Sequence, residues 1–199
     1  RVLRGMQFAA RFGMTVDPET AAEARSISGE YDSISTERVA EEFMKLATKG
    51  AEPGRAIEYL RQTGWIEHFP ALAAVLDVPQ EPKWHPEGPV GVHTAVAMDQ
   101  AAKIADREGL VGDDRAVLVL AAMLHDVGKA TTTENGPDGI TSIGHAEVGA
   151  PQAREALNAI GIKKEIVDKV ERLVAEHMAH VRYGPGTKPS AIRRLAQRL

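Results

Sequence analysis

The hydrophobic and polar positions of this chain recur with the period of an α-helix along nearly its whole length. In the first part, proline and acids mark helix starts, and glycine marks helix ends. These signals predict helices that run from Val2 to Gly13, from Asp17 onward, from Ser35 onward and from Pro53 to Gly64, followed by a short apolar helical element over 65–76. In the helix that begins at Ser35, the expected buried residues are Val39, Phe43, Leu46 and Ala47.

Proline and glycine interrupt the helical pattern over residues 77–91. This break predicts a connection between two helical parts, and therefore two domains, 1–78 and 79–199. Beyond the break, the same period predicts helices over 92–108, 113–127, 145–160, 163–179 and 189–199. The polar stretch from Thr131 to Ile143, with Asn135-Gly136-Pro137-Asp138-Gly139 inside it, predicts a small hairpin or flap. The expected fold class is all-α.

Composition narrows the possible functions. The chain has 199 residues, 43% of them hydrophobic, and no cysteine, so any metal ligands must be His, Asp or Glu. No apolar run approaches the roughly 20 residues needed to span a bilayer, and the N-terminus has no signal-peptide pattern. A cytoplasmic location is expected. Because the chain starts with Arg1, we also expect a fragment or a processed product.

Charge is distributed unevenly, although the net value is only −4. The first sixteen residues and those from His177 to Leu199 contain no acid. Two basic ends on an acidic body are suited to following a phosphate backbone. Ordinary solvated helix faces explain the same pattern equally well.

The most informative residues are His125 and Asp126, followed by Val127, Gly128 and Lys129. The apolar run before them points into a core, so two titratable groups at its end are costly unless they are paired or bind a cation. Gly128 should let the backbone turn tightly beside them. Lys129 is suited to neutralising an anion drawn to the cation.

Two ligands do not make a site, and three more histidines lie in separate predicted elements: His93, His145 and His177. Helices that converge on one point build metal sites in this way. The sequence therefore predicts one common divalent cation held by His93, His125, Asp126, His145 and His177, with Mg, Mn, Ni, Co, Fe and Zn not distinguished. Asp126 and Lys129 are the expected catalytic residues. The alternative is a chance set of histidines in a helical protein.

The remaining candidates are weaker. His68 and His85 are expected to be ordinary core or surface residues. His180 has three possible roles, as an extra ligand, a phosphate contact or a helix-terminal cation, of which we favour the last two. Arg172 or Arg182 can also face a phosphate, although nothing in the spacing requires it.

The stretch from His93 through His125-Asp126-Val127-Gly128-Lys129 and Gly144-His145 to His177 resembles the HD phosphohydrolase superfamily, over about residues 88–180. The resemblance implies a helical fold and metal-dependent phosphoester hydrolysis. The usual final ligand of that family is an aspartate downstream of the last histidine, and no aspartate follows His177 here.

A second resemblance covers the first part of the chain. Residues 1–13 resemble the helix of bacterial tRNA nucleotidyltransferases (CCA-adding enzymes and poly(A) polymerases) that carries their nucleotide-reading motif, with Arg1 as the motif's arginine. Residues 34–43 are similar to the family's next signature, and residues 80–88 to its junction sequence. The resemblance implies that Arg1, Arg4 and Arg38 face nucleotide or RNA, with tRNA and nucleotides as partners.

Three functional hypotheses follow. The leading one is a fragment of a CCA-adding-type enzyme that lacks the catalytic head and does not add CCA. Its HD domain would hydrolyse 2′,3′-cyclic phosphates, 2′-nucleotides or phosphomonoesters. The second is a non-catalytic tRNA- or RNA-binding module with a degenerate HD site. The third is a stand-alone nucleotide phosphohydrolase with an unrelated helical prefix.

Overall fold

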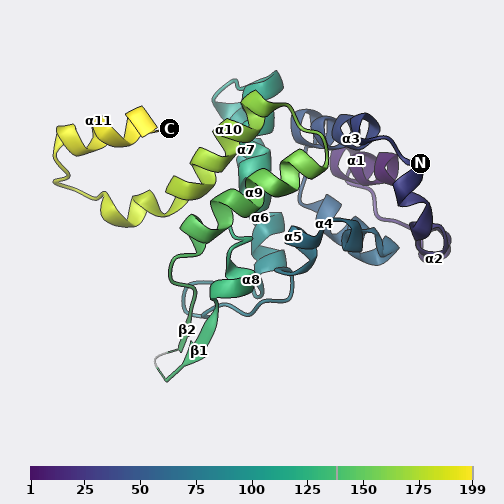
Figure 1. Ribbon diagram of the computed structural model, residues 1–199, viewed down its shortest axis with the longest axis horizontal. Coiled ribbons are helices and arrows are strands. Elements are labelled where there is room, and N and C mark those ends of the chain that lie inside the picture. Colours follow the sequence, from purple (N-terminus) through teal and green to yellow (C-terminus); the bar gives the residue numbers. More distant parts are fainter. Residues whose placement is uncertain (138, 199) are drawn as a thin grey trace.

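The computed structural model describes residues 1–137 and 139–198, and it is all-α apart from one small hairpin (Figure 1). The expected fold class is therefore confirmed. Asp138 and Leu199 lie outside the described residues, as do the side chains of His180 and Arg182. In the described part of the chain, none of the helices combines the length and apolar character that crossing a membrane requires.

The N-terminal helices follow the predicted starts and ends. Asp17 caps its helix by accepting a hydrogen bond from the Glu19 amide at 2.9 Å. Gly13 and Gly64 end theirs in the left-handed conformation, with φ of 65° and 72°. The elements are α1 (Val2–Phe12), α2 (Pro18–Ser26), α3 (Thr36–Lys49), α4 (Arg55–Thr63) and α5 (Pro70–Ala73), with 3₁₀ turns at Ser28–Ser33 and Trp65–His68.

Two details of this part differ from the prediction. The apolar stretch at 65–76 forms a 3₁₀ turn and the short α5 rather than one helix. The apolar positions of α1 predict one face that includes Phe8 with Val2, Leu3, Met6, Ala9 and Ala10, but Phe8 does not join that buried face and is 38% exposed. It lies two residues beyond the buried Met6, so it projects from the opposite side of the helix. Its ring packs instead against that of Phe12, with the centroids 5.7 Å apart.

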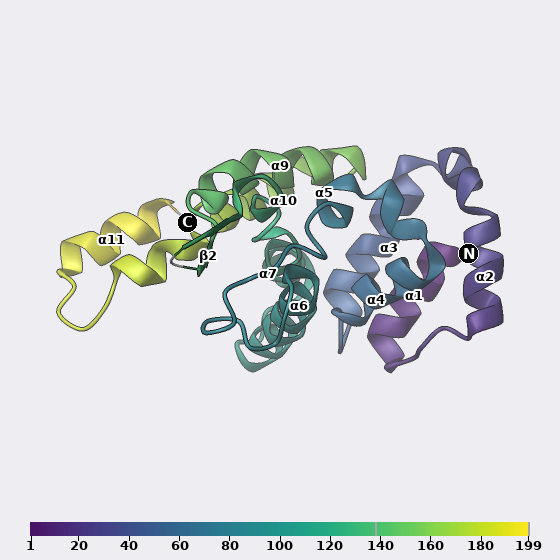
Figure 2. The same ribbon diagram turned by 90° about the horizontal axis from the view of Figure 1, so that it is seen from below.

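The second part consists of two packed helix pairs with a hairpin at one end. Helix α6 (Val90–Arg107) packs against α7 (Gly112–Leu124), and α9 (His145–Ala159) packs against α10 (Lys164–Glu176), which also contacts α7. The predicted hairpin is β1 (Glu134–Gly136) paired antiparallel with β2 (Gly139–Thr141). The short helix α8 (Lys129–Thr132) includes residues 131 and 132, the first two of the polar stretch expected to form the hairpin or flap. A 3₁₀ turn over His177–Arg182 leads to α11 (Pro189–Arg198), which projects from the body (Figure 2).

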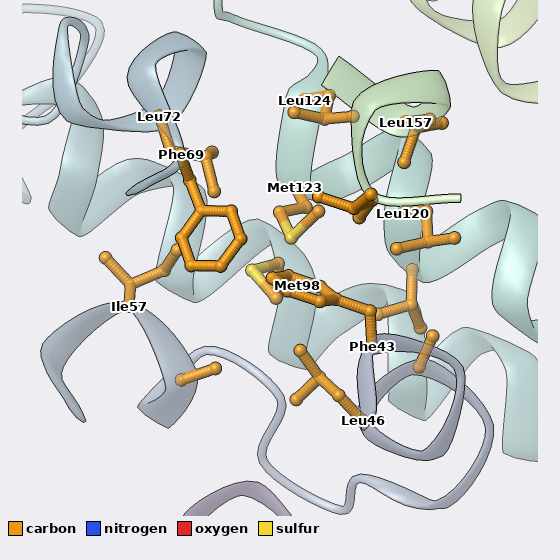
Figure 3. Close-up of a cluster of buried hydrophobic side chains, with 14 of the residues drawn as sticks. Phe43, Leu46, Ile57, Phe69, Leu72, Met98, Leu120, Met123, Leu124 and Leu157 are labelled. Atoms are coloured by element: carbon orange, nitrogen blue, oxygen red, sulfur yellow. The ribbon is translucent and has the colours of Figure 1, made fainter. Parts of the chain in front are cut away.

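The hydrophobic core continues past the proline-rich connection. Figure 3 shows Phe43 of α3 beside Met98 of α6, with Phe69 and Leu72 facing Met123 and Leu124 of α7. Arg115, only 6% exposed, adds a polar link by donating to the Gly50 carbonyl at 2.8 Å and to the Ala102 carbonyl at 3.2 Å. The N-terminal helices thus share one core with α6 and α7, the two helices that position His93 and His125.

Candidate metal centre

The five expected ligands lie together although they come from four different elements. His93 is in the first turn of α6, and His125 with Asp126 directly follows the end of α7. His145 is the first residue of α9, and His177 directly follows α10. Ring centroids of successive histidines are 5.2 Å apart for His93 and His125, and 4.9 Å apart for His145 and His177.

Asp126 is the centre of this cluster and is 2% exposed. Its Oδ2 atom lies 3.2 Å from His125 Nε2 and 3.7 Å from His93 Nε2. Its Oδ1 atom lies 3.3 Å from His145 Nε2 and 3.8 Å from His177 Nε2. The carboxylate therefore stands between two pairs of imidazoles and presents one oxygen to each pair.

All four imidazoles are oriented by a second contact at Nδ1. His125 Nδ1 lies 2.8 Å from the Ala122 carbonyl, His145 Nδ1 lies 2.7 Å from the Ser142 carbonyl, and His177 Nδ1 lies 2.6 Å from the Val174 carbonyl. A carbonyl oxygen only accepts, so Nδ1 must carry the hydrogen in each case. His93 Nδ1 lies 2.6 Å from Glu87 Oε1 in the same way. Neutral rings held like this present a lone pair at Nε2, which is the usual metal-ligand atom.

The Nε2 atoms meet in two close pairs, which argues for a cation. His93 and His125 are 3.2 Å apart at Nε2, and His145 and His177 are 3.0 Å apart. Two lone pairs at such distances repel unless a proton or metal ion lies with them. Burial lowers the pKa of His93, and it lowers the pKa of His177 to about 4, so protonation is disfavoured. The donor set fits a divalent metal.

The acidic groups of the site are ionised at neutral pH. Burial by itself raises the pKa of Asp126, but its contacts with His125 and His145 and the charge of Lys129 outweigh burial and hold that pKa well below its usual range. A backbone hydrogen bond, with further ones from His85 and His93, lowers the pKa of Glu87 to about 2. Asp126 Oδ2 has no hydrogen-bond partner among the described residues, but the Lys129 ammonium lies 2.8 Å away and compensates its charge as an ion pair.

The structure divides the expected ligands into two groups. His93, His125 and Asp126 bring their donor atoms within 4.8 Å of one another, and so do Asp126, His145 and His177. The sequence predicted one common cation for all five residues. Two triads that share one carboxylate fit two ions better, because opposite oxygens of Asp126 face opposite pairs of rings.

Lys129 is buried at 7% exposure and faces Asp126. Its Nζ lies 2.8 Å from Asp126 Oδ2 as an ion pair and donates a hydrogen bond to Gln80 Oε1 at 2.7 Å. Gln80 and Asp126 thus hold in place the ammonium of Lys129 that is expected to contact phosphate.

Gly128 has a different role from the expected tight turn. Its φ of −64° and ψ of −20° are ordinary helical values that any residue adopts. A Cβ atom at this position would lie 2.1 Å from the His145 carbonyl oxygen and 2.8 Å from the Gly149 nitrogen. Glycine is needed because the start of α9 approaches the backbone here, and this approach places His145 beside Asp126.

Sequence reasoning missed three polar residues of the proline-rich connection: Gln80, His85 and Glu87. Glu87 Oε1 binds both His85 Nδ1, at 3.1 Å, and His93 Nδ1. His85 was expected to be an ordinary residue, yet its ring centroid lies 4.7 Å from that of His93. The available signal was a glutamate six residues before a candidate ligand.

Other candidates lie away from the cluster. His68 bonds the Ser28 hydroxyl at 2.8 Å and stacks on Tyr31, as expected of an ordinary histidine. Arg172 is exposed on α10. The suggested roles of the His180 and Arg182 side chains fall outside the described residues.

The three predicted nucleotide-facing arginines lie on the N-terminal helices. Arg1 precedes α1, Arg4 is on α1, and Arg38 is on α3, and all three are exposed. Lys45 chiefly, with help from Arg4 and Arg38, holds the pKa of Glu41 below its usual range. Arg4 and Arg38 therefore lie near the same carboxylate, on helices that pack together.

Comparison with known families agrees with this geometry. The HD domain family matches residues 90–198, and the family described as the probable RNA and SrmB-binding site of polymerase A matches residues 13–76. The chain belongs to the HD domain family and has the organisation of the C-terminal region of CCA-adding enzymes. The match at 13–76 overturns the idea of an unrelated helical prefix.

Curated relatives carry the name Multifunctional CCA protein. The chain is 37% identical to the one from Shewanella frigidimarina over 174 residues, 84% of this chain and 39% of that protein. For the one from Cupriavidus metallidurans the identity is 42% over 139 residues, 68% of this chain and 31% of the relative. For Halorhodospira halophila it is 35% over 196 residues, 94% and 45% respectively. The chain thus spans less than half the length of these relatives.

Proposed function

We propose that the His–Asp cluster hydrolyses phosphoesters with the help of divalent metal ions. The observation that carries this proposal is the set of four Nε2 atoms arranged around the two oxygens of Asp126, each ring fixed at Nδ1 by an acceptor. A site built only to stabilise the fold has no need for close pairs of imidazole nitrogens around one carboxylate. The proposed substrates are 2′,3′-cyclic phosphates, 2′-nucleotides and phosphomonoesters.

The donors support two ions, with Asp126 as the shared ligand. His93 and His125 would serve one ion, and His145 and His177 the other. A divalent cation polarises a phosphoryl oxygen and acidifies water at neutral pH. Glu87 keeps the His93 ring in the orientation that exposes Nε2, and the three carbonyl contacts do the same for the other rings.

Residues of the chain would stabilise the charge that develops during hydrolysis. Hydrolysis adds water to phosphorus and breaks one P–O bond, and negative charge grows on the phosphoryl oxygens and the leaving oxygen. The ammonium of Lys129 is buried next to the carboxylate, where its charge is poorly screened and stabilises that growing charge. Gln80 holds the ammonium in place by accepting one of its hydrogens.

A second function belongs to the N-terminal helices. The match of residues 13–76 to an RNA-binding family favours a contact with RNA. We propose that tRNA is the partner and that Arg1, Arg4 and Arg38 contribute to the contact. A chain that only binds RNA through this region, with an inactive cluster, is the alternative to the hydrolytic reading.

Metal content and turnover test the proposal together. The purified chain is assayed with 2′,3′-cyclic AMP and Ni²⁺, Mn²⁺, Co²⁺ or Mg²⁺, and bound metal is measured by mass spectrometry. We expect about two ions per chain, and Asp126→Asn should remove both and lower kcat/KM by at least about 100-fold, because the lost carboxylate serves both triads. His145→Gln should lower the content to about one ion per chain.

Asp114→Asn provides a matched control. Asp114 lies in the first turn of α7, at the opposite end of that helix from the cluster, and pairs at the surface with Lys169. This variant should keep its metal and its activity. Bound metal without turnover of any of these esters would favour the RNA-binding alternative, and unchanged metal in Asp126→Asn would refute the assigned cluster.

A further inference from the structure

The segment between α5 and α6 is held at three points, two at the metal centre and one at the hairpin. Gln80 Oε1 accepts from Lys129 Nζ at 2.7 Å, and Glu87 Oε1 lies 2.6 Å from His93 Nδ1. Between them, Glu81 Oε2 accepts from the Ile140 amide of the hairpin at 3.1 Å. This segment, residues 79–89, is therefore held in place against the site rather than being a free linker.

The segment exposes a tryptophan beside the site. Trp84 is 70% exposed, whereas Trp65 is 2% exposed. The amide nitrogens of both Trp84 and His85 lie 3.0 Å from the Glu81 carbonyl, so the backbone at this point is fixed in a turn. The next residue, His85, has its ring against that of His93. An indole is thus presented to solvent one residue away from a side chain that contacts a metal-ligand ring.

The surroundings of Trp84 suit a nucleotide. The Lys83 ammonium lies 4.8 Å from the centre of the indole ring. This positive charge stays close to the ring, while most of the indole surface remains open. Exposed aromatic rings next to positive charge bind nucleobases by stacking while the charge attracts phosphate. Trp84 is not part of the hydrophobic core, so packing within the fold does not explain why a tryptophan stands here.

A second candidate site is less suitable for such a ligand. An apolar cavity of about 390 Å³ lies among Phe69, Leu72, Met123 and Leu157, and the carboxylate of Glu155 lines it as well. A phosphoester would meet an acid there, and none of the described residues that line the cavity is a lysine or an arginine. The ammonium of Lys83 and the exposed ring of Trp84 occur together on the segment at 79–89.

We propose that Trp84 stacks against the base of the substrate while its phosphate lies at the His–Asp cluster. This proposal rests on the proposed hydrolytic function and narrows its substrates to nucleoside phosphoesters, such as nucleoside 2′,3′-cyclic phosphates and 2′-nucleotides. Phosphoesters without a base lack the group that Trp84 recognises. Trp84 is therefore a specificity residue and takes no part in the chemical step.

Paired substrates test this inference. We compare kcat/KM for 2′,3′-cyclic AMP with that for glycerol 1,2-cyclic phosphate, which has the same reactive ring and no base. Trp84→Ala should lower the ratio of the two values by about 5- to 100-fold, mainly through a higher KM for the nucleotide, which is the range expected for one base–aromatic stack. Trp84→Phe should restore most of the ratio, because phenylalanine also stacks.

A control variant and a binding measurement make the result decisive. Val111→Ala removes another exposed apolar side chain, 78% exposed, before the start of α7, and should leave the ratio unchanged. Adenosine 2′-monophosphate should quench the fluorescence of Trp84 in the wild-type chain. The quenching should disappear in Trp84→Phe, where only the buried Trp65 emits.

The outcomes separate this inference from the proposed function. An unchanged substrate ratio in Trp84→Ala, or no quenching by the nucleotide, would overturn base stacking even if both esters are hydrolysed. An equal loss on both substrates would show that Trp84 only supports the loop, and would also overturn it. Absence of hydrolysis in the wild type would contradict the proposed function, while the quenching measurement still decides whether Trp84 binds the base.

Discussion

At the scale of single residues, the site depends on which imidazole nitrogen carries the proton. Carbonyl oxygens of Ala122, Ser142 and Val174 each fix one ring through Nδ1. The acceptors lie three residues before their histidines, at the ends of helices or in the turn before α9. The same local geometry thus selects the metal-binding tautomer three times.

This arrangement predicts an acid sensitivity of the metal-free protein. Burial lowers the pKa of His177 from its ordinary 6.5 to about 4. A histidine whose pKa is lower in the folded state contributes stability above pH 6.5, and this contribution is lost as the pH falls toward 4. Between pH 7 and pH 5 we expect the free energy of unfolding to fall by about 2 kcal/mol because of this residue.

Urea unfolding of the chelator-treated protein at the two pH values measures the effect. His177→Gln should show a smaller fall by about the same 2 kcal/mol, since glutamine does not titrate. Asp126 and Glu87, whose pKa values are lowered, lose their contributions only below about pH 4.5 and so lie outside this window. Parallel pH profiles for the two proteins would contradict the predicted burial effect.

At the scale of elements, sequence patterns located the helices well and the supporting contacts poorly. The His125-Asp126 pair stood out because two titratable groups end an apolar run. Gln80 and Glu87 did not stand out, because they lie in a segment without periodicity. The Gln80–Lys129 contact joins residues 49 positions apart, and no local pattern encodes such a distance.

The close approach of α8 and α9 was equally invisible in the sequence, since a glycine with ordinary helical angles resembles any loop glycine. Gly128→Ala should force α9 away from Asp126, because the new Cβ would collide with the His145 carbonyl. We expect a loss of about 1–3 kcal/mol of stability and reduced metal content by mass spectrometry, with the helical circular dichroism largely retained.

Gly29→Ala makes the same chemical change in open space, where no atom lies within 4 Å of the added carbon. Its stability and metal content should match the wild type. If Gly128→Ala also bound metal normally, the contact between these two elements would not position His145.

At the scale of the whole molecule, the two family matches occupy one continuous core. Phe43 of α3, Met98 of α6 and Leu120 of α7 are all nearly or fully buried in it. The division into 1–78 and 79–199 is a proposal from the proline-rich break and the two matches. The shared core argues that these parts do not unfold separately.

Met98→Ala tests whether the parts unfold together. Met98 is 0% exposed, so we expect a loss of about 2–5 kcal/mol in the free energy of unfolding. Hydrogen exchange should rise by a similar factor in the protected amides of α3 and α10. Faster exchange in α6, α7 and α10 alone, with α3 unchanged, would show two independent units.

Helices α6 and α7 connect the metal centre to the N-terminal helices. The start of α6 carries His93, the end of α7 leads into His125, and both helices also pack against α3 or α4. An ion held by His93 and His125 would therefore bind to the same helices that pack against α3 and α4, which in turn contact α1. If RNA bound at Arg4 and Arg38 favours the same packed form of these helices, thermodynamic linkage requires that RNA binding also raises the affinity of the site for the ion.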